Sequence, residues 1–376
     1  MENNHSAILY GVPRVAYGQD GCTPFPMCIL SCARYLGIPV DYARAMAESG
    51  AAFRLVWDTS CWNGGNVDAI LSFDSSDQIF LCGMRAMERD LKILKRTPDP
   101  KQDLAHFPNC PQVKQRMPGT SKSPSVQKED FMAFIRNEID QGNPVIALGI
   151  IGPPEACVIA GYRENGNLLL GWNVFQEYPE YRASVTFDKN GYFITGDWWE
   201  NPETIALIAT GTKPLLPFSL KEVLANATEA LRGRMCGTYA KGTLAYDAWK
   251  NALLCDRDFP RDAVFPVLVE RMMCHGDAMD CLSDGRMNAA KYLRQMAEQY
   301  PLQAPGLKKA AAEFEQITKI LWEEMIPVLG GWERGEKQIR QLARPETRRL
   351  FAAQIERMKT HDERALACLC QLAEAE

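Results

Sequence analysis

The hydrophobic pattern of this chain changes near residue 214, and that change limits the folds open to it. Before that point, short apolar runs alternate with turn residues, as adjacent β-strands do; they occupy residues 144–151, 156–162, 168–172 and 203–209. The Asn165-Gly166 pair between the second and third runs is a strong hairpin signal. After Pro214 and Pro217, apolar residues recur every three or four positions, which is the period of amphipathic helices. The pattern predicts an α+β domain over residues 1–213 and an all-α helical bundle over residues 214–376.

Helical patterns also precede the predicted strands. They cover residues 25–36, 41–48 and 128–141. In the second half, Ser219 and Glu222 have the spacing of a capping box, which marks the start of the first helix there. The helices expected after residue 214 cover residues 219–232, 242–254, 262–275, 285–300, 307–328, 335–342 and 345–375. Residues 97–125 are rich in Pro, Ser and Lys and predict a long surface loop.

Composition excludes several classes of protein. The net charge of −5 argues against a nucleic-acid-binding surface, which normally carries a basic excess. No apolar run is long enough to cross a bilayer and no secretory signal is recognisable, so we expect no membrane partner and a cytoplasmic location. The 13 cysteines are scattered and odd in number, which predicts reduced packing residues and no disulfide framework.

One cysteine stands out because of its local sequence. Cys22 lies directly before Thr23 and Pro24, which suit the N-cap and first position of a helix. A thiol beside the free N–H groups of a helix N-terminus has a lowered pKa and becomes more nucleophilic. Cys22 is therefore the leading candidate for a catalytic residue, and the alternative is a half-buried packing residue.

The order of these features resembles the papain-like cysteine peptidase clan. A cysteine begins the first buried helix, and an antiparallel sheet follows whose second strand runs from Ala156 to Gly161-Tyr162. Residues 8–212 are most similar to the N-terminal domain family of butirosin-biosynthesis protein H, which is acyltransferase-like, and more distantly to bacteriocin-processing peptidases. The resemblance implies a papain-like fold in which Glu155 occupies the position of the histidine base and Asn173 that of the orienting asparagine.

The chain departs from that family at two catalytic positions. Glu155 replaces the histidine, and a carboxylate of ordinary pKa near 4.3 is a poor general base at neutral pH. Papain-like enzymes place the oxyanion glutamine about six residues before the cysteine, where this chain has Ala16; Gln19 lies three residues before Cys22. We therefore expect no peptidase activity.

Three functions remain open from the sequence. The first is a non-proteolytic protein that binds a small molecule or peptide, with candidate ligand-binding residues Trp57, Trp62, Asn63, Asn66, Cys157 and Trp172. The second is a Cys22-dependent acyltransferase or amidohydrolase in which Glu155 or an incoming amine accepts the proton. The third is an N-terminal-nucleophile hydrolase released by cleavage between Gly21 and Cys22. The first is our leading hypothesis.

Metal and cofactor chemistry has little support in the sequence. Cys22, Glu155 and Cys157 could share one face of the predicted site, but the sequence identifies no complete set of zinc ligands around them. The glycine-rich residues 63–66 lack the lysine of a phosphate-binding loop. We expect neither a metal nor a cofactor. Apolar residues of the helical half, namely Trp322, Leu329 and Trp332, suggest a possible homodimer interface.

Overall fold

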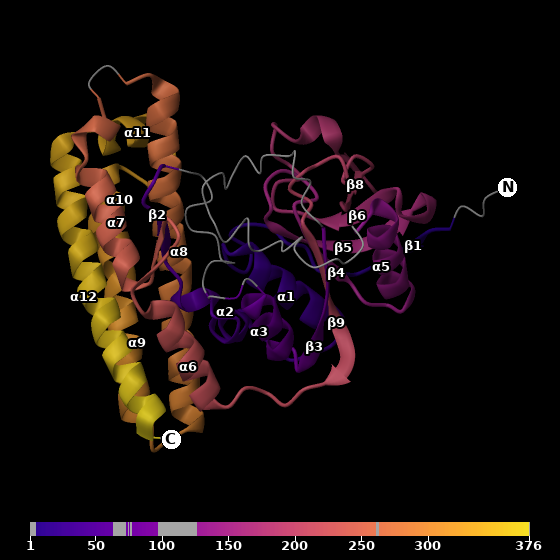
Figure 1. Cartoon of the computed structure of the whole chain (residues 1–376), viewed down its shortest axis with the longest axis horizontal. Helices are drawn as coiled ribbons and strands as arrows, with labels where there is room; N and C mark the ends of the chain where they lie inside the picture. Colours follow the sequence, from indigo (N-terminus) through magenta and orange to yellow (C-terminus); the bar gives the residue numbers. More distant parts are fainter. Residues whose placement is uncertain are drawn as a thin grey trace. The chain divides into compact units, whose positions relative to one another are not determined.

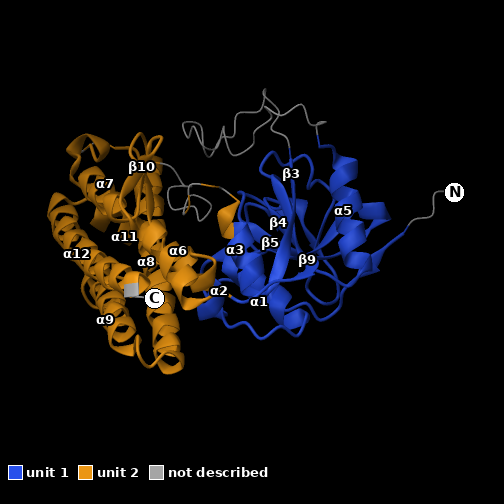
Figure 2. Cartoon of the chain, turned by 60° about the horizontal axis from the view of Figure 1, so that its bottom comes forward, with its two compact units in different colours: residues 1–45, 80–108, 113–217 blue, residues 46–79, 109–112, 218–376 orange. Residues whose placement is uncertain are grey.

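The computed structural model describes residues 5–62, 73, 75, 77–96, 126–260 and 263–375. The chain is α+β, as predicted: an antiparallel eight-stranded sheet lies in the first half and helices dominate the second (Figure 1). It divides into two compact units, formed by residues 1–45, 80–108 and 113–217 and by residues 46–79, 109–112 and 218–376 (Figure 2).

The first unit is built on the large sheet, whose strands follow the order β3-β9-β4-β5-β6-β8-β7, with β1 paired to β5. The strands are β1 (Ala7–Ile8), β3 (Arg89–Lys95), β4 (Val145–Leu148), β5 (Ala156–Arg163), β6 (Leu168–Trp172), β7 (Thr186–Phe187), β8 (Phe193–Thr195) and β9 (Ala206–Pro214). Helices α1 (Pro24–Tyr35) and α5 (Lys128–Asp140) lie on opposite sides of this sheet (Figures 1 and 2). Helices α2 (Tyr42–Glu48) and α3 (Gln78–Ala86) stand where the chain passes from one unit to the other.

Alternation along the strands produces the core of the first unit. Successive side chains of a strand point to opposite faces, so residues two apart share a face. Cys157 and Ile159 of β5 accordingly pack in one buried cluster with Phe131 and Ile135 of α5. The hairpin between β5 and β6 forms where the sequence predicted it, and Asn165 (φ 57°) and Gly166 (φ 104°) adopt the left-handed conformation that this pair favours.

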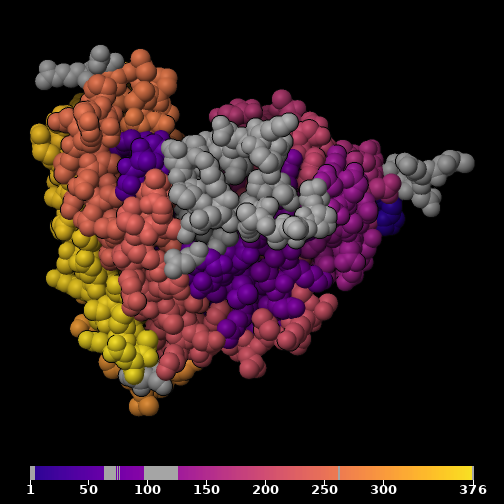
Figure 3. Space-filling model, in the orientation of Figure 1, coloured from indigo at the N-terminus to yellow at the C-terminus, as the bar shows by residue number. Residues whose placement is uncertain are grey.

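The second unit is mainly helical. Its helices are α6 (Leu220–Leu231), α7 (Thr243–Leu254), α8 (Phe265–Gln299), α9 (Ala304–Lys319), α10 (Ile326–Leu329), α11 (Glu336–Leu342) and α12 (Pro345–Ala375), with a π-helical turn at Ile320–Met325. The helices from α8 onward, orange to yellow, form a continuous surface in Figure 3. Strands β2 (Val56–Asp58), β10 (Arg234–Cys236) and β11 (Tyr239–Lys241) add a small antiparallel sheet, which the sequence analysis missed.

Two expectations for the helical half differ from the structure. The separate helices expected at 262–275 and 285–300 are one helix, α8, which passes through Gly276 and Gly285 without a break. Gly285 is needed inside the helix because a Cβ there would lie 2.8 Å from the Ala52 carbonyl oxygen. The predicted boundary after residue 213 assigns residues 46–79 to the first half, whereas β2 pairs with β11 in the second unit.

Within the described ranges, no helix combines the length and apolar character needed to cross a membrane.

Candidate functional site

Cys22 is an exposed thiol directly before α1. Thr23 is the N-cap residue, as predicted, but its side chain makes no capping hydrogen bond. Its backbone N–H donates to Tyr42 Oη at 3.1 Å. A Cβ on Gly21 would lie 2.1 Å from Tyr42 Cζ, so glycine is required where the chain turns toward Cys22.

The start of α1 offers few free N–H groups to a thiolate. A helix normally leaves four N–H groups unpaired at its N-terminus, and these carry much of the positive end of the helix dipole. Here Pro24 and Pro26 have no N–H, and that of Thr23 is bonded to Tyr42. Phe25 is the remaining source among the first four positions. The helix therefore activates Cys22 less than the sequence motif suggested.

Glu155 is half-buried and immediately precedes β5. Its backbone carbonyl accepts a hydrogen bond from Gly149 N at 3.2 Å, which fixes the backbone just before the first residue of β5. Burial, followed by the charges of Cys157, Cys32 and Glu155, raises the pKa of the Cys28 thiol well above its usual value. Cys28 is fully buried in α1.

Asn173 follows β6 directly and builds the next loop. It is 1% exposed; its Oδ1 accepts from Phe175 N at 2.8 Å and its N–H donates to Gln176 Oε1 at 3.0 Å. Its Nδ2 has no hydrogen-bond partner in the described part of the chain. Burial raises the pKa of Cys157 to about 12, while the Asn173 side chain opposes that rise and so lies beside this thiol. Asn173 makes no hydrogen bond to Glu155 and shapes the loop instead.

Trp172, at the end of β6, forms a wall of a surface pocket of about 530 Å³. Its Nε1 donates to the Val12 carbonyl oxygen at 2.8 Å, and its ring packs edge-on against Tyr192 with centroids 4.9 Å apart. The indole is thereby fixed. The pocket is completed by Arg14, Glu177, Arg182, Phe187, Asn190 and Gly191.

Two guanidinium groups give this pocket its charge. Arg14 pairs with Glu177 at 2.8 Å and lies over the Trp172 ring, 5.8 Å from its centroid. Arg182 lies 4.6 Å from the centroid of Phe187 and has no carboxylate partner among the described residues. Guanidinium groups stacked on rings keep their N–H edges free for a carboxylate or phosphate. The arrangement fits an oxyanion.

The other candidate ligand-binding residues do not meet at this pocket. Trp57 and Trp62 belong to the second unit and are 2% and 8% exposed. Trp57 packs between Trp62 and Trp249, with ring centroids 5.3 and 6.1 Å away, and Trp62 Nε1 donates to Asp258 at 3.0 Å. They are core residues because strand β2 faces α7. Cys157 is fully buried, and Asn63 and Asn66 lie outside the described residues.

Besides Glu155 and Asn173, the first unit contains Gln19 and the histidines at positions 5 and 106. Gln19 is exposed in the turn before Cys22. His5 is the one histidine described in that unit, and its Nδ1 contacts Tyr162 Oη at 2.5 Å. His106 lies outside the described residues. Among the residues that the structure describes, no group of three His, Cys, Asp or Glu side chains is arranged to hold a metal ion.

The sequence analysis missed Arg14 and Arg182. Neither lies in a motif, and they are 168 positions apart, so no local signal links them. The one sequence clue was that Arg182 follows shortly after the predicted strand that ends at Trp172.

Comparison with known proteins adds no assignment, since no protein-family model and no curated protein matches the chain.

Proposed function

We propose that this chain is a papain-like protein, similar to the N-terminal domain family of butirosin-biosynthesis protein H, that binds a small-molecule or peptide ligand and does not cleave peptides. The observation that carries the proposal is the pocket beside Trp172, where Arg182, which has no carboxylate partner in the part of the chain that the structure describes, shares the lining with the fixed indole of Trp172. The ligand class is an oxyanion, either a carboxylate or a phosphate. A cytoplasmic location belongs to the same proposal.

Loss of hydrolysis is supported by the surroundings of Cys22. Two prolines remove N–H groups from the helix start, and a carboxylate stands where the family has a base. These features reduce both the nucleophilicity of Cys22 and the means of protonating a leaving group.

A thermal-shift titration tests the binding pocket. We expect inorganic phosphate or acetate to raise the melting temperature, because a ligand that binds only the folded state stabilises it. Arg182→Ala should weaken the response by about threefold to tenfold, the range for loss of a charge-assisted contact. Cys22→Ala should leave it unchanged.

Lys213→Ala is the matched control, since it removes one cation from β9, which is separated from β6 by strands β4 and β5 in the sheet. An equal weakening by Arg182→Ala and Lys213→Ala would mean that the response reflects net charge. That result, or no response to either anion, would contradict the proposed site.

One observation favours a second candidate function, Cys22-dependent acyl transfer. The thiol is exposed, and thioester chemistry needs less assistance than amide cleavage. In that case an acyl thioester should leave a mass adduct on Cys22. An N-terminal-nucleophile function would instead be revealed by an intact mass lacking residues 1–21.

A further inference from the structure

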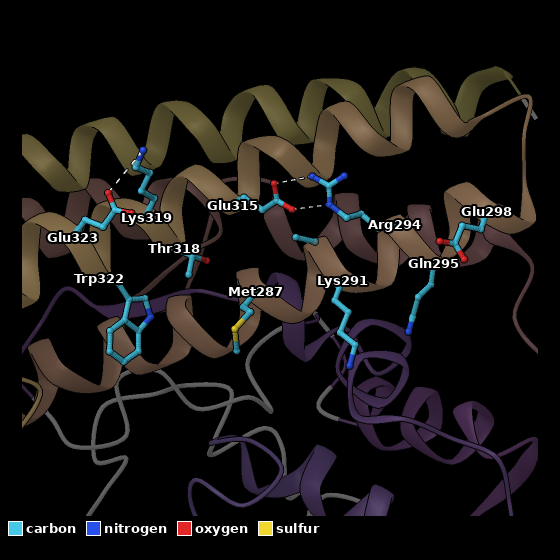
Figure 4. Close-up of a pocket in the computed structure, with 11 residues that line it drawn as sticks. Met287, Lys291, Arg294, Gln295, Glu298, Glu315, Thr318, Lys319, Trp322 and Glu323 are labelled. Atoms are coloured by element: carbon cyan, nitrogen blue, oxygen red, sulfur yellow. Dashed lines mark hydrogen bonds and ion pairs between the residues drawn. The ribbon is translucent and has the colours of Figure 1, made fainter.

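A second hollow, independent of the site described above, lies between α8 and α9 in the helical unit. It has a volume of about 690 Å³, within the range of small-molecule sites. Figure 4 shows Trp322, Met287, Lys291 and Gln295 in a row along one side of the two helices. We call this hollow the α8–α9 groove.

At one end of the groove, the Trp322 ring forms an aromatic platform whose position is fixed by its neighbours. Trp322 lies in the π-helical turn at Ile320–Met325, an irregularity often found at functional sites. Its ring stacks on Trp332 with centroids 4.6 Å apart and an interplanar angle of 8°, and its Nε1 donates to Ser283 Oγ at 2.9 Å. The indole is therefore fixed although 49% of its surface is exposed. Met287, 52% exposed, extends the apolar surface toward Lys291.

Some charged residues that line the groove form ion pairs with each other, and others do not. Arg294 pairs with Glu315 at 2.6 Å, and Lys319 pairs with Glu323 at 3.8 Å, as the dashed lines in Figure 4 show. Lys291 and Glu298 are exposed lining residues that take part in no ion pair of the described chain. Lys291 lies one helical turn from Met287, about 6 Å along the axis, whereas Glu298 lies about 16 Å from it. The unpaired charge next to the aromatic platform is therefore positive.

We propose that the α8–α9 groove binds a small planar aromatic acid. Its ring would stack on the exposed face of Trp322 and against the Met287 thioether, and its carboxylate would bind the Lys291 ammonium. This inference goes beyond the proposed function and does not depend on it. The homodimer suggested from sequence is a competing use of this surface, although Leu329, at 1% exposure, lies in the core and not on an exposed face.

Equilibrium dialysis of the full chain against three probes with the same ring tests the proposal: 2-naphthoate, neutral 2-naphthamide and cationic 2-naphthylmethylamine. We expect 2-naphthoate to bind about threefold to tenfold more tightly than the other two. Lys291→Gln should remove this preference, and Lys291→Glu should reverse it toward the amine. Trp322→Leu should weaken the binding of all three probes, because stacking of the naphthalene ring on the indole is lost irrespective of the probe's charge.

Lys308→Gln, an exposed lysine of α9 that does not line the groove, is the matched control and should leave binding unchanged. Arg182→Ala should also leave it unchanged, which separates this groove from the pocket beside Trp172. Equal affinity for acid and amine, or a preference that survives Lys291→Gln, would overturn the proposal. So would absence of binding together with a concentration-dependent dimer that Trp322→Leu dissociates.

Discussion

Replacing Asp362 by alanine should lower the free energy of unfolding by about 3–5 kcal/mol, the usual cost of leaving a buried charge without its partner. Arg286 and Asp362 are both fully buried. Arg286 donates from Nη2 to Asp362 Oδ2 at 2.6 Å and from Nε to Oδ1 at 2.9 Å, and Tyr246 Oη donates to Oδ2 at 2.7 Å. The alanine variant would leave the Arg286 guanidinium buried without its carboxylate partner. Urea denaturation followed by circular dichroism measures the loss.

The control is Glu336→Ala, which breaks an exposed ion pair with Arg340 and should change stability by less than about 1 kcal/mol. The double replacement Arg286→Met, Asp362→Leu should recover much of the loss, because it leaves no unpaired charge. If Asp362→Ala were no more costly than Glu336→Ala, the buried pair would not hold the unit together as described.

Acidification should destabilise the helical unit through His275. This side chain is fully buried; Trp249 Nε1 donates to its Nδ1 at 3.2 Å, and its ring stacks on Phe351 at 5.2 Å. Burial, with a smaller effect from Arg334, lowers the pKa of His275 to about 3. The unfolded chain protonates this residue near pH 6.5, so its neutral form stabilises the fold above that pH. As the pH falls from about 7 to about 4.5, we expect the free energy of unfolding to decrease by about 3 kcal/mol.

The measurement compares the pH dependence of unfolding in the natural sequence and in His275→Gln, which keeps an acceptor for Trp249. The comparison is needed because burial raises the pKa of Asp280 to about 6, and that group acts in the opposite direction, losing its contribution as pH rises. The variant should be less sensitive to acid than the natural sequence. Identical acid sensitivity in the two would exclude His275 as the cause.

Local signals in the sequence predicted the α+β class, the helical second half and four of the eight strands of the large sheet. The hairpin at Asn165-Gly166 and the helix start at Ser219 depend on residues close together in the chain, and both form as expected; Ser219 and Glu222 make the reciprocal cap. Failures occurred where distant residues decide the outcome. The helices expected at 262–275 and 285–300 are one helix, in which Gly285 admits the Ala52 backbone. Pairing of β2 with β11 joins positions about 180 residues apart, which no local pattern encodes.

In the candidate site too, features set by local sequence were predicted, and features set by tertiary packing were not. The cysteine, the N-cap and the strand that ends at Trp172 could be recognised from short motifs, and the structure has them where expected. The tryptophans at 57 and 62 could not be separated from ligand-binding aromatics, because exposure depends on what packs over them. The prolines at 24 and 26 were visible, but their effect on Cys22 emerges only when Thr23 N–H is seen to be bonded to Tyr42.

The rate of Cys22 alkylation as a function of pH tests the central claim most directly, with each cysteine followed by peptide mass mapping. Since Cys22 is exposed, the reference is a free cysteine in a model peptide and not a buried thiol. The account predicts that Cys22 reacts no faster than this reference at about pH 7. The midpoint of its rate-against-pH curve should lie at or above about 8.5, the ordinary pKa of a thiol. Selective labelling of Cys22 at neutral pH, with a midpoint well below that value, would contradict it and would identify Cys22 as an activated nucleophile.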